Sequence, residues 1–302
     1  MNSIDKKALL SSNASSNLFI HLELFFVVAI WAGTFVSTKI ILTQISPTLS
    51  ALYRYLIASG ILLLLNYRTL EKIQRRDYGC ILLISLTGVT FYYLFQHIGI
   101  NYTNATDAAI LISLTPVFTG LISWILFRDQ LKIVTFFGLF LAFIGSIFVI
   151  TDGSPLINTF DMRMWGDLLI LLTSICWAIY SVYGKRLLLF YSVNTLITYS
   201  TVLGTLFLIP FCINDIINGN NYALNLVGWI NLFYLGGAAS VYGYLAWYRA
   251  LKKLSAVTVG SYLYFRPLLT GIIAAAILNE QVGFFVIIGG FFIIGGTYLS
   301  TK

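Results

Sequence analysis

The sequence predicts an all-α integral membrane protein with ten transmembrane helices. These are expected to form two inverted five-helix repeats, with the N- and C-termini both in the cytoplasm. Three observations lead to this prediction: a composition too apolar for a soluble domain, an asymmetric placement of Lys and Arg, and a repeat that relates the second half of the chain to the first.

The composition excludes an ordinary soluble protein. Of the 302 residues, 59% are hydrophobic and only 10% are charged, whereas soluble domains carry about 25% charged residues. Apolar stretches close to the ~20 residues that span a bilayer recur along the chain. Turn residues and charges divide them into ten expected spans, in chain order 21–43, 47–66, 79–98, 104–126, 132–150, 167–187, 194–213, 227–248, 258–278 and 283–300.

The links between spans define the expected organisation. Residues 1–20 are expected to form a disordered tail, since most of this stretch is polar. It lacks the apolar core and cleavage site of a signal peptide. A first five-helix repeat then covers 21–150, an external link covers 151–166, and a second five-helix repeat covers 167–300. The three cysteines lie singly in apolar segments, so we expect no disulfide framework, no metal site and no cofactor.

Basic residues gather on one side of the predicted membrane. With the N-terminus inside, the external links hold only Arg163, and the cytoplasmic segments hold 14 of the 18 basic residues: Lys6, Lys7, Arg68, Lys72, Arg75, Arg76, Arg128, Lys132, Lys185, Arg186, Arg249, Lys252, Lys253 and Lys302. Lys and Arg near span ends stay cytoplasmic, which predicts this orientation in the plasma membrane. The asymmetry explains the net charge of +7 without a nucleic-acid partner. The expected partners are the lipid bilayer and a small-molecule substrate.

The second half of the chain repeats the first. Matched pairs at an offset of 146 include Trp31 with Trp177 and Lys39 with Lys185, and those at an offset of 151 include Tyr93 with Tyr244, Ala105 with Ala256, Pro116 with Pro267, Gly120 with Gly271, and Gln130 with Gln281. Because each unit has an odd number of spans, the second unit enters the membrane upside down. Inverted repeats of this kind are typical of secondary transporters, in which the substrate site lies near the midplane between the halves.

The same stretches resemble a known family. "IWAGTFVSTKIILTQISPTLSALYRYLIASGILLLL" is similar to the first two helices of the EamA branch of the drug/metabolite transporter superfamily. "TDAAILISLTPVFTGLISWILFRDQL" and "SAVTVGSYLYFRPLLTGIIAAAILNEQV" resemble its paired fourth and ninth helices, each with a mid-helix Pro and a closing acid. The resemblance implies ten helices around a central cavity and transport, often export, of small metabolites or amino acids. Asp129 replaces the more usual Glu, and Arg266 is not part of the pattern.

Two arginines, Arg54 and Arg266, lie within spans. Facing lipid, each would cost about 2.5–3.5 kcal/mol on insertion scales. Their repeat partners are Ser200 and Thr115, so neither belongs to the symmetric framework, and the acidic residues lie near span ends. Two interpretations stay open: groups inside the bundle satisfy each arginine, or both face a wet cavity and bind a substrate carboxylate or phosphate. The second makes both candidate substrate-binding residues.

Aromatic residues are candidate walls for the apolar part of the substrate. Trp31 and Trp177 are related by the repeat and lie mid-span, away from the interfacial belt where Trp is usual. We expect them on opposite sides of the cavity, with symmetric helix packing as the alternative. Tyr92 and Tyr262 are further candidate walls.

The fourth and ninth spans carry the expected moving parts. Pro116 with Gly120, and Pro267 with Gly271, are candidate hinges, because a mid-helix Pro leaves a backbone carbonyl without its helical partner. Asp107, about three residues inside the fourth span, is the candidate for proton coupling.

The fifth and tenth spans show two further shared features. Asp129 and Glu280 directly precede them, so capping of the exposed N–H groups is favoured over proton coupling. Small residues on one face, such as Gly138, Gly145 and Gly289, predict close helix packing. The sequence leaves open whether this packing is within one chain or across a homodimer.

The sequence therefore predicts a secondary transporter, expected to export a small metabolite such as an amino acid or organic anion by alternating access, with no enzymatic activity and no catalytic residues. No Walker-type phosphate loop is present, so ATP is not expected to drive transport. One alternative is an integral-membrane enzyme acting on lipid-linked substrates, which would usually show clustered acids or His at one membrane face. A membrane scaffold is a third interpretation, but it gives no reason for two arginines in the membrane interior.

Overall fold

The computed structural model describes residues 3–127, 133–151, 161–217, 224–254 and 256–300, and all regular structure in these ranges is helical. Seven helical stretches within them are long and apolar enough to cross a membrane: Phe19–Leu42, Pro47–Asn66, Arg75–Tyr102, Ala105–Leu126, Met162–Leu187, Val193–Ile217 and Thr258–Leu278. Two shorter apolar helical stretches, Phe140–Thr151 and Phe284–Gly296, accompany them. The chain is thus an α-helical, multi-pass membrane protein.

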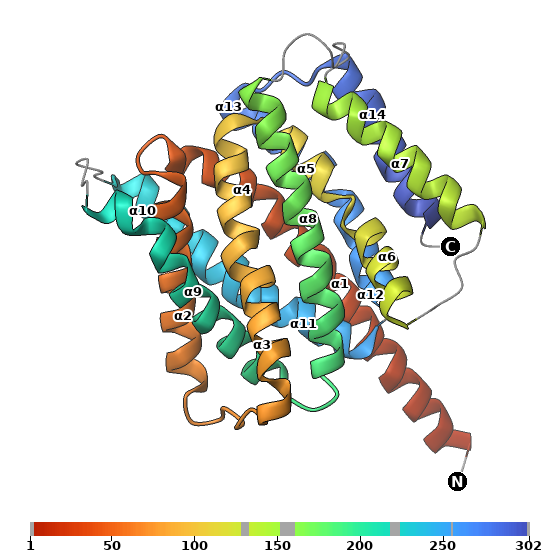
Figure 1. Ribbon diagram of the computed structural model, residues 1–302. Coiled ribbons are helices and arrows are strands. Elements are labelled where there is room, and N and C mark those ends of the chain that lie inside the picture. Colours follow the sequence, from red (N-terminus) through yellow and green to blue (C-terminus); the bar gives the residue numbers. More distant parts are fainter. Residues whose placement is uncertain (1–2, 128–132, 152–160, 218–223, 255, 301–302) are drawn as a thin grey trace.

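The first half of the chain forms a series of helices (Figure 1). In order they are α1 (Ser3–Leu42), α2 (Pro47–Asn66), the 3₁₀ turn η1 (Arg75–Asp77), α3 (Tyr78–Ser85), the π-helical turn η2 (Leu86–Thr90), α4 (Phe91–Tyr102), α5 (Ala105–Ile112), α6 (Thr115–Phe127) and α7 (Ile133–Thr151). The start of α2 has a clear local cause. The Ser46 hydroxyl accepts a hydrogen bond from Leu49 N at 3.3 Å. Pro47, in the first turn, has no backbone N–H and therefore needs no acceptor there.

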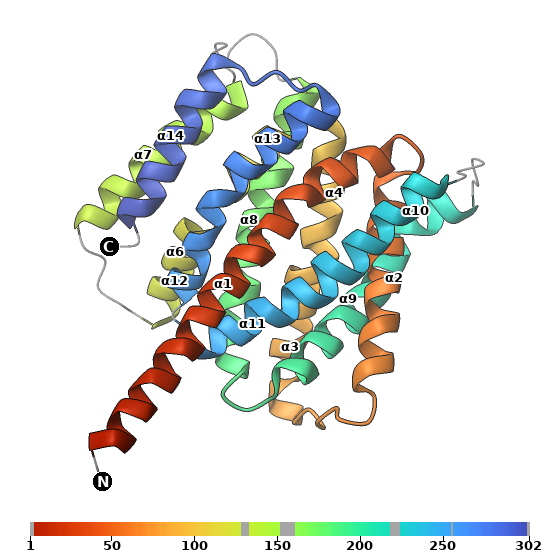
Figure 2. The ribbon, with the colours of Figure 1, turned by 180° about the vertical axis from the view of Figure 1, so that it is seen from behind.

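The second half follows the same order. It contains α8 (Met162–Leu187), α9 (Val193–Ile217), α10 (Leu226–Phe233), the π-helical segment η3 (Tyr234–Tyr242), α11 (Gly243–Lys253), α12 (Ala256–Ser261), the 3₁₀ turn η4 (Tyr262–Phe265), α13 (Arg266–Leu278) and α14 (Phe284–Ser300). The α2–α3 link, the α8–α9 link and the start of α1 lie at one end of the bundle, and the α1–α2 and α13–α14 links lie at the other (Figures 1 and 2).

The N-terminal segment differs from the prediction. Residues 1–20 were expected to be a disordered tail, but α1 is helical from Ser3 and continues without a break into the first span. The physical reason is that propagating an existing helix adds one hydrogen bond for each residue fixed, whereas starting one is costly.

Interruptions occur at matching places in the two halves. The fourth span breaks after Ile112 into α5 and α6, and the ninth span passes through the 3₁₀ turn η4 between α12 and α13. These positions correspond at the offset of 151 seen in the sequence, and the π-helical segments η2 and η3 correspond at the same offset. Pro116 and Pro267 therefore stand in the first turn of a new helix, not in the middle of a continuous one.

The pair α7 and α14 lies side by side within one chain, at the edge of the bundle (Figures 1 and 2). A Cβ atom built on Gly145 would lie 2.6 Å from the Gly289 carbonyl oxygen, so only glycine permits this approach. Within this chain, the small-residue faces of α7 and α14 thus pack against each other.

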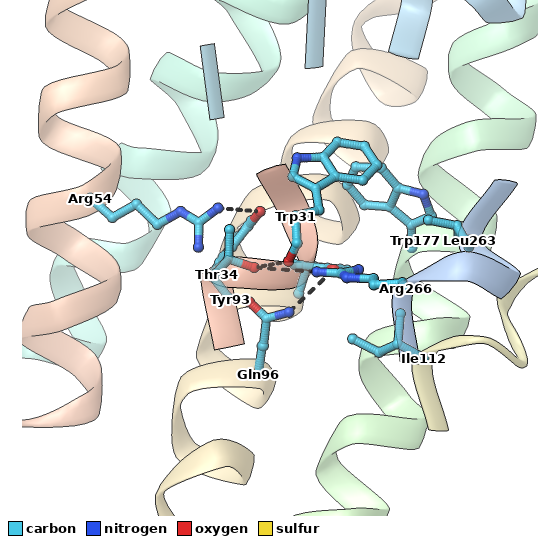
Figure 3. Close-up of a pocket in the computed structure, with 10 residues that line it drawn as sticks. Trp31, Thr34, Arg54, Tyr93, Gln96, Ile112, Trp177, Leu263 and Arg266 are labelled. Atoms are coloured by element: carbon cyan, nitrogen blue, oxygen red, sulfur yellow. Dashed lines mark hydrogen bonds between the residues drawn. The ribbon is translucent and has the colours of Figure 1, made fainter. Parts of the chain in front are cut away.

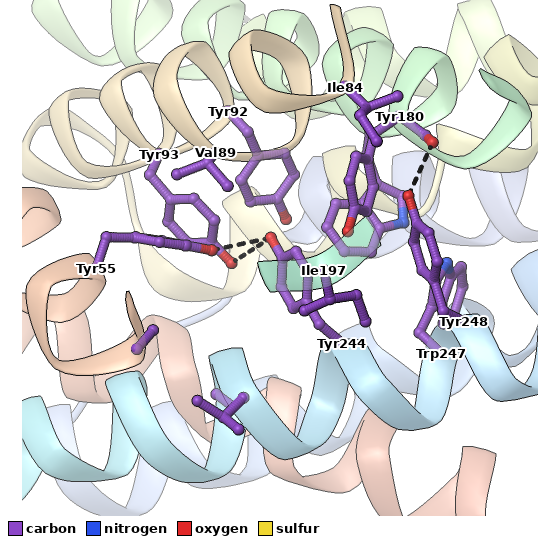
Figure 4. Packing of buried hydrophobic residues seen from close by; sticks show 14 of the residues in the cluster. Tyr55, Ile84, Val89, Tyr92, Tyr93, Tyr180, Ile197, Tyr244, Trp247 and Tyr248 are labelled. Atoms are coloured by element: carbon purple, nitrogen blue, oxygen red, sulfur yellow. Dashed lines mark hydrogen bonds between the residues drawn. The ribbon is translucent and has the colours of Figure 1, made fainter. Parts of the chain in front are cut away.

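The main core is rich in aromatic side chains from α2, α4, α8 and α11 (Figure 4). The Tyr55 hydroxyl donates to the Tyr244 hydroxyl at 3.0 Å, and the Tyr244 and Tyr93 hydroxyls lie 3.1 Å apart. The Tyr244 hydroxyl also lies 3.0 Å from the Gly88 carbonyl of η2. These phenols therefore satisfy one another inside the bundle and connect the two halves directly beside the candidate site.

Candidate functional site

A pocket inside the bundle brings together most of the predicted site residues (Figure 3). Five of the six candidate substrate-binding residues line it, and they come from both halves of the chain: Trp31 of α1, Arg54 of α2, Tyr92 of α4, Trp177 of α8 and Arg266 of α13. Five more residues that the sequence did not single out complete the lining: Thr34, Tyr93, Gln96, Ile112 and Leu263. We call these ten residues the central pocket.

Arg54 is held from two directions. Its side chain is buried, with an exposure of 1%, and Nε donates to Ser240 Oγ at 2.9 Å. Nη2 donates to the Tyr93 hydroxyl at 3.1 Å, and the guanidinium carbon lies 4.3 Å from the centre of the Tyr93 ring. Nη1 is buried and has no hydrogen-bond partner among the described residues. The arginine is therefore oriented but not fully satisfied.

Arg266 has fewer partners. Its exposure is 4%, its Nη2 donates to Thr34 Oγ1 at 3.4 Å, and its Nε is buried without a partner in the described part of the chain. The guanidinium carbon lies 4.4 Å from the centre of the Phe35 ring and 5.8 Å from that of Trp31. Aromatic contacts thus replace some of the solvation that the charge loses on burial.

Neither arginine has an acidic partner among the residues that the structure describes. The ion pairs within the described ranges involve Lys39, Arg76, Arg163 and Arg249, and no Asp or Glu described lies within 4.0 Å of either guanidinium. Two buried cations without a counter-charge are costly in a medium of low dielectric constant. The site is thus electrostatically incomplete and suited to an anion.

The two tryptophans meet in the centre of the protein. Their ring centres are 5.4 Å apart and the rings are nearly perpendicular, at 87°. Trp31 Nε1 donates to the Ala239 carbonyl at 2.9 Å, whereas Trp177 Nε1 is buried without a partner among the described residues. They therefore lie side by side in the lining of one pocket, in edge-to-face contact, and do not stand on opposite sides of a cavity.

The central pocket is nearly filled by its own side chains. The space within it that the centre of a water molecule can reach measures about 10 Å³, which is room for roughly one water. A molecule much larger than water does not fit into the pocket as it stands.

Tyr262 lies outside the central pocket. Its hydroxyl is 2.5 Å from His21 Nδ1, and both side chains line a separate crevice together with Phe25. The side chain points to this crevice because η4 turns it away from its neighbour Leu263, which does line the central pocket.

Asp107 is buried near the start of α5, away from the two arginines. Its Oδ2 lies 3.1 Å from Arg163 Nη2 and accepts from Asn104 Nδ2 at 3.2 Å. The ion pair with Arg163 joins α5 to α8.

The hydrogen bonds of the Glu280 carboxylate within the described residues go to α5, not to the helix that follows it. The carboxylate accepts hydrogen bonds from Ala105 N at 2.9 Å and Thr106 N at 3.2 Å, and Lys39 Nζ lies 3.6 Å away. The acid therefore caps α5, a helix of the other half, instead of α14 as expected. The reason is that the start of α5 lies beside the α13–α14 link and offers N–H groups without helical partners. Asp129, its repeat partner, lies outside the described residues.

The candidate hinges adjoin the central pocket. The break before Pro116 follows Ile112, and Pro267 follows Arg266, so each interruption positions a lining residue. Around Gly120 no side chain lies within 4 Å of a built Cβ, and around Gly271 the nearest is Thr106 Cγ2 at 3.6 Å. These positions have room to change conformation.

Some lining residues that the sequence analysis did not name lie three or four residues from a predicted one, on the same face of its helix. Tyr92, Tyr93 and Gln96 fall on neighbouring positions of one helix, and Tyr93 matches Tyr244 in the repeat. Thr34 lies three residues after Trp31 and therefore on the same face of α1. Ile112 and Leu263 carry no comparable signal in the sequence.

Comparison with known proteins agrees with this architecture. The sequence model of the EamA-like transporter family matches residues 18–151 and again 164–302. An "Uncharacterized transporter" of Archaeoglobus fulgidus is 37% identical over 284 residues, covering 93% of this chain and 96% of that protein. "Uncharacterized transporter YyaM" of Bacillus subtilis is 27% identical over 291 residues, covering 93% and 94%. One solved crystal structure is 16% identical and superposes with a TM-score of 0.66, covering 93% of this chain and 98% of that chain, which shows a shared fold.

Proposed function

The chain belongs to the EamA-like transporter family, and from this premise we propose that it is a secondary transporter of a small metabolite with an anionic group. An amino acid or an organic anion meets that description. Export across the plasma membrane is the proposed direction, by alternating access through the central pocket.

The observation that carries this proposal is the pairing of Arg54 and Arg266 in one buried pocket without an acidic partner among the described residues. A structural arginine inside a membrane protein normally has an acid or a full set of carbonyl partners. Here each guanidinium has one buried nitrogen without a hydrogen-bond partner among the described residues, Nη1 of Arg54 and Nε of Arg266. A carboxylate or phosphate supplies both the missing charge and the missing acceptors.

The proposed topology has ten helices as two inverted repeats, over residues 21–150 and 167–300, with an external link over 151–166 and both termini cytoplasmic. Two features support it. The family model matches once in each half, and the broken spans and π-helical turns fall at matching positions in both halves. The basic α2–α3 link and the start of α1 also lie at the same end of the bundle (Figure 1).

The proposed transport cycle uses the interruptions as hinges. When α5 and α13 rotate about the turns before Pro116 and Pro267, the pocket lining moves with them, because Ile112 and Arg266 adjoin those turns. Glu280 holds the start of α5 to the α13–α14 link, so releasing this contact is the step that opens the end of the bundle where Glu280 lies.

Replacement of Arg266 tests the proposal. Arg266→Lys keeps the charge but loses the planar pair of donors, so substrate affinity in proteoliposomes should fall measurably. Arg266→Gln should lower it further while the protein still inserts, since the change removes a charge from the membrane interior. Arg68→Gln, an exposed arginine of the α2–α3 link, serves as the matched control. Parental transport by both Arg266 variants would mean that this arginine is structural.

A further inference from the structure

The fully buried side-chain atoms of the central pocket that lack a hydrogen-bond partner among the described residues are all donors. Among the buried side-chain atoms of its ten lining residues, three have no hydrogen-bond partner in the described structure: Arg54 Nη1, Arg266 Nε and Trp177 Nε1. All three are N–H donors. A ligand that completes this site must therefore bring acceptors.

The hydroxyl oxygens of the pocket already serve protein donors. The Tyr93 hydroxyl accepts from Arg54 at 3.1 Å, Thr34 Oγ1 accepts from Arg266 at 3.4 Å, and the Tyr92 hydroxyl accepts from Gln96 Nε2 at 3.3 Å. Because these oxygens already accept from the protein, a ligand ammonium group, which carries three donors and no acceptor, could use only their remaining lone pairs.

The charge of the pocket disfavours a cationic group in the same way. None of its lining residues is an Asp or Glu, and two are arginines. Like charges at close range in a poorly solvated site repel one another strongly, because little water is present to screen them. An ammonium group there has no acidic partner to offset that repulsion.

The aromatic faces that could hold a cation are occupied as well. Arg54 lies over Tyr93, and Arg266 lies over Phe35 and within 5.8 Å of the Trp31 ring centre. Trp177 is surrounded by the rings of Trp31, Tyr92, Tyr180, Tyr244 and Trp247 at centre distances of 5.1 to 5.7 Å. A cation–π site for a ligand ammonium group would need an open face.

We infer that the substrate is an organic acid with an apolar body and no ammonium group, and that its carboxylate binds the unused N–H groups of Arg54, Arg266 and Trp177. The inference rests on the proposed function and narrows it, since it selects organic anions over amino acids. The apolar body then lies against the aromatic wall formed by Trp31, Trp177 and Tyr92.

Matched pairs of ligands test this inference. Each pair consists of an amino acid and the same acid without its amino group: alanine and propionate, leucine and 4-methylpentanoate, phenylalanine and 3-phenylpropionate, tryptophan and 3-indolepropionate. Binding to the purified full-length protein in detergent is measured by titration calorimetry. In every pair that binds, we expect the acid without the amino group to bind at least about tenfold more tightly, a difference of about 1.4 kcal/mol.

Two variants separate failure of the inference from failure of the proposed function. Arg266→Gln should abolish binding of the acids, and Arg68→Gln should leave it unchanged. Equal or tighter binding of the amino acids, still lost in Arg266→Gln, would overturn the inference and leave the anion contact of the proposed function intact. If 2-phenylethylamine binds more tightly than every acid and amino acid of the series, and Arg266→Gln does not change its binding, the inference and the proposed function both fail. If no acid of the series binds, the inference is likewise contradicted.

Discussion

Glu280 and Ala105 lie 175 residues apart in the chain, yet the Glu280 carboxylate accepts a hydrogen bond from the Ala105 backbone N–H at 2.9 Å. The contact joins the link before α14 to the first turn of α5. Thr106 N and Lys39 Nζ complete the surroundings of the same carboxylate. One side chain therefore fastens three elements at one end of the bundle.

Glu280→Gln should loosen this end. Hydrogen bonds to a charged group contribute about 1.5–3 kcal/mol each, so losing the charge should raise the population of the conformation open at this end roughly tenfold or more. The measurement is the rate at which an impermeant thiol reagent labels a cysteine placed at Ile112 in a variant without the native cysteines. Gln281→Ala, an exposed neighbour, is the control. An unchanged labelling rate in Glu280→Gln would show that the contact does not close the pocket.

Accessibility of single cysteines should reveal the proposed orientation. Cysteines near Asn104 and Asp161 should react with an impermeant reagent from outside the cell, and cysteines near Arg75 and Lys253 should react only from inside. The reason is the cytoplasmic placement of Lys and Arg near span ends. If a cysteine at the Arg75 position reacted from outside the cell, the orientation would be the opposite of the one proposed.

The two hinge prolines should control the rate of transport more than affinity. Pro116→Ala and Pro267→Ala remove the ring that blocks a helix from continuing back through each interruption, and stiffer helices raise the barrier to the conformational change. We expect turnover to fall about tenfold, equivalent to about 1.4 kcal/mol in the barrier, with the substrate Kd nearly unchanged. Pro210→Ala provides the matched comparison, because Pro210 lies inside α9, away from both turns. Parental turnover in a variant with both Pro116→Ala and Pro267→Ala would contradict the hinge hypothesis.

Trp31 and Trp177 should respond differently to the same replacement. Trp31→Phe loses the hydrogen bond to Ala239 and leaves a buried carbonyl without it, so the free energy of unfolding should fall by about 1–3 kcal/mol more than the loss of ring area alone would cause. Trp177→Phe removes a donor that has no protein partner, so it should lack this additional loss and should weaken substrate binding instead. Thermal denaturation and titration calorimetry separate the two effects. Identical stability changes would contradict the distinction.

The α7–α14 contact should tolerate no side chain at Gly145. Gly145→Ala places a Cβ 2.6 Å from the Gly289 carbonyl oxygen, so the helices must move apart and stability should fall by about 1–3 kcal/mol. Gly60→Ala is the control, since nothing lies within 4 Å of its built Cβ. There the higher helix propensity of Ala should instead add up to about 1 kcal/mol. Equal outcomes in thermal denaturation would show that α7 and α14 do not pack through Gly145.

The sequence alone predicted an α-helical membrane protein, and five of the six candidate substrate-binding residues that it singled out line the central pocket. Hydropathy is a property of each segment by itself, so the spans could be identified without knowing how they pack. Arg54, Arg266, Trp31, Trp177 and Tyr92 were identifiable because a charge or a mid-span Trp is unusual in an apolar stretch, whatever its neighbours. The repeat then predicted that residues from both halves meet.

Other features were decided by the tertiary structure. Tyr262 was predicted beside the same cavity, but η4 turns its side chain toward His21. The partner of Glu280 depends on the crossing of α5 with the α13–α14 link, which no local pattern encodes. The contact of Trp31 with Trp177 likewise depends on how α1 packs against α8. Membrane insertion selects segments one by one, by their own transfer free energies, whereas these contacts depend on the rotation and spacing of whole helices, which packing between distant parts of the chain determines.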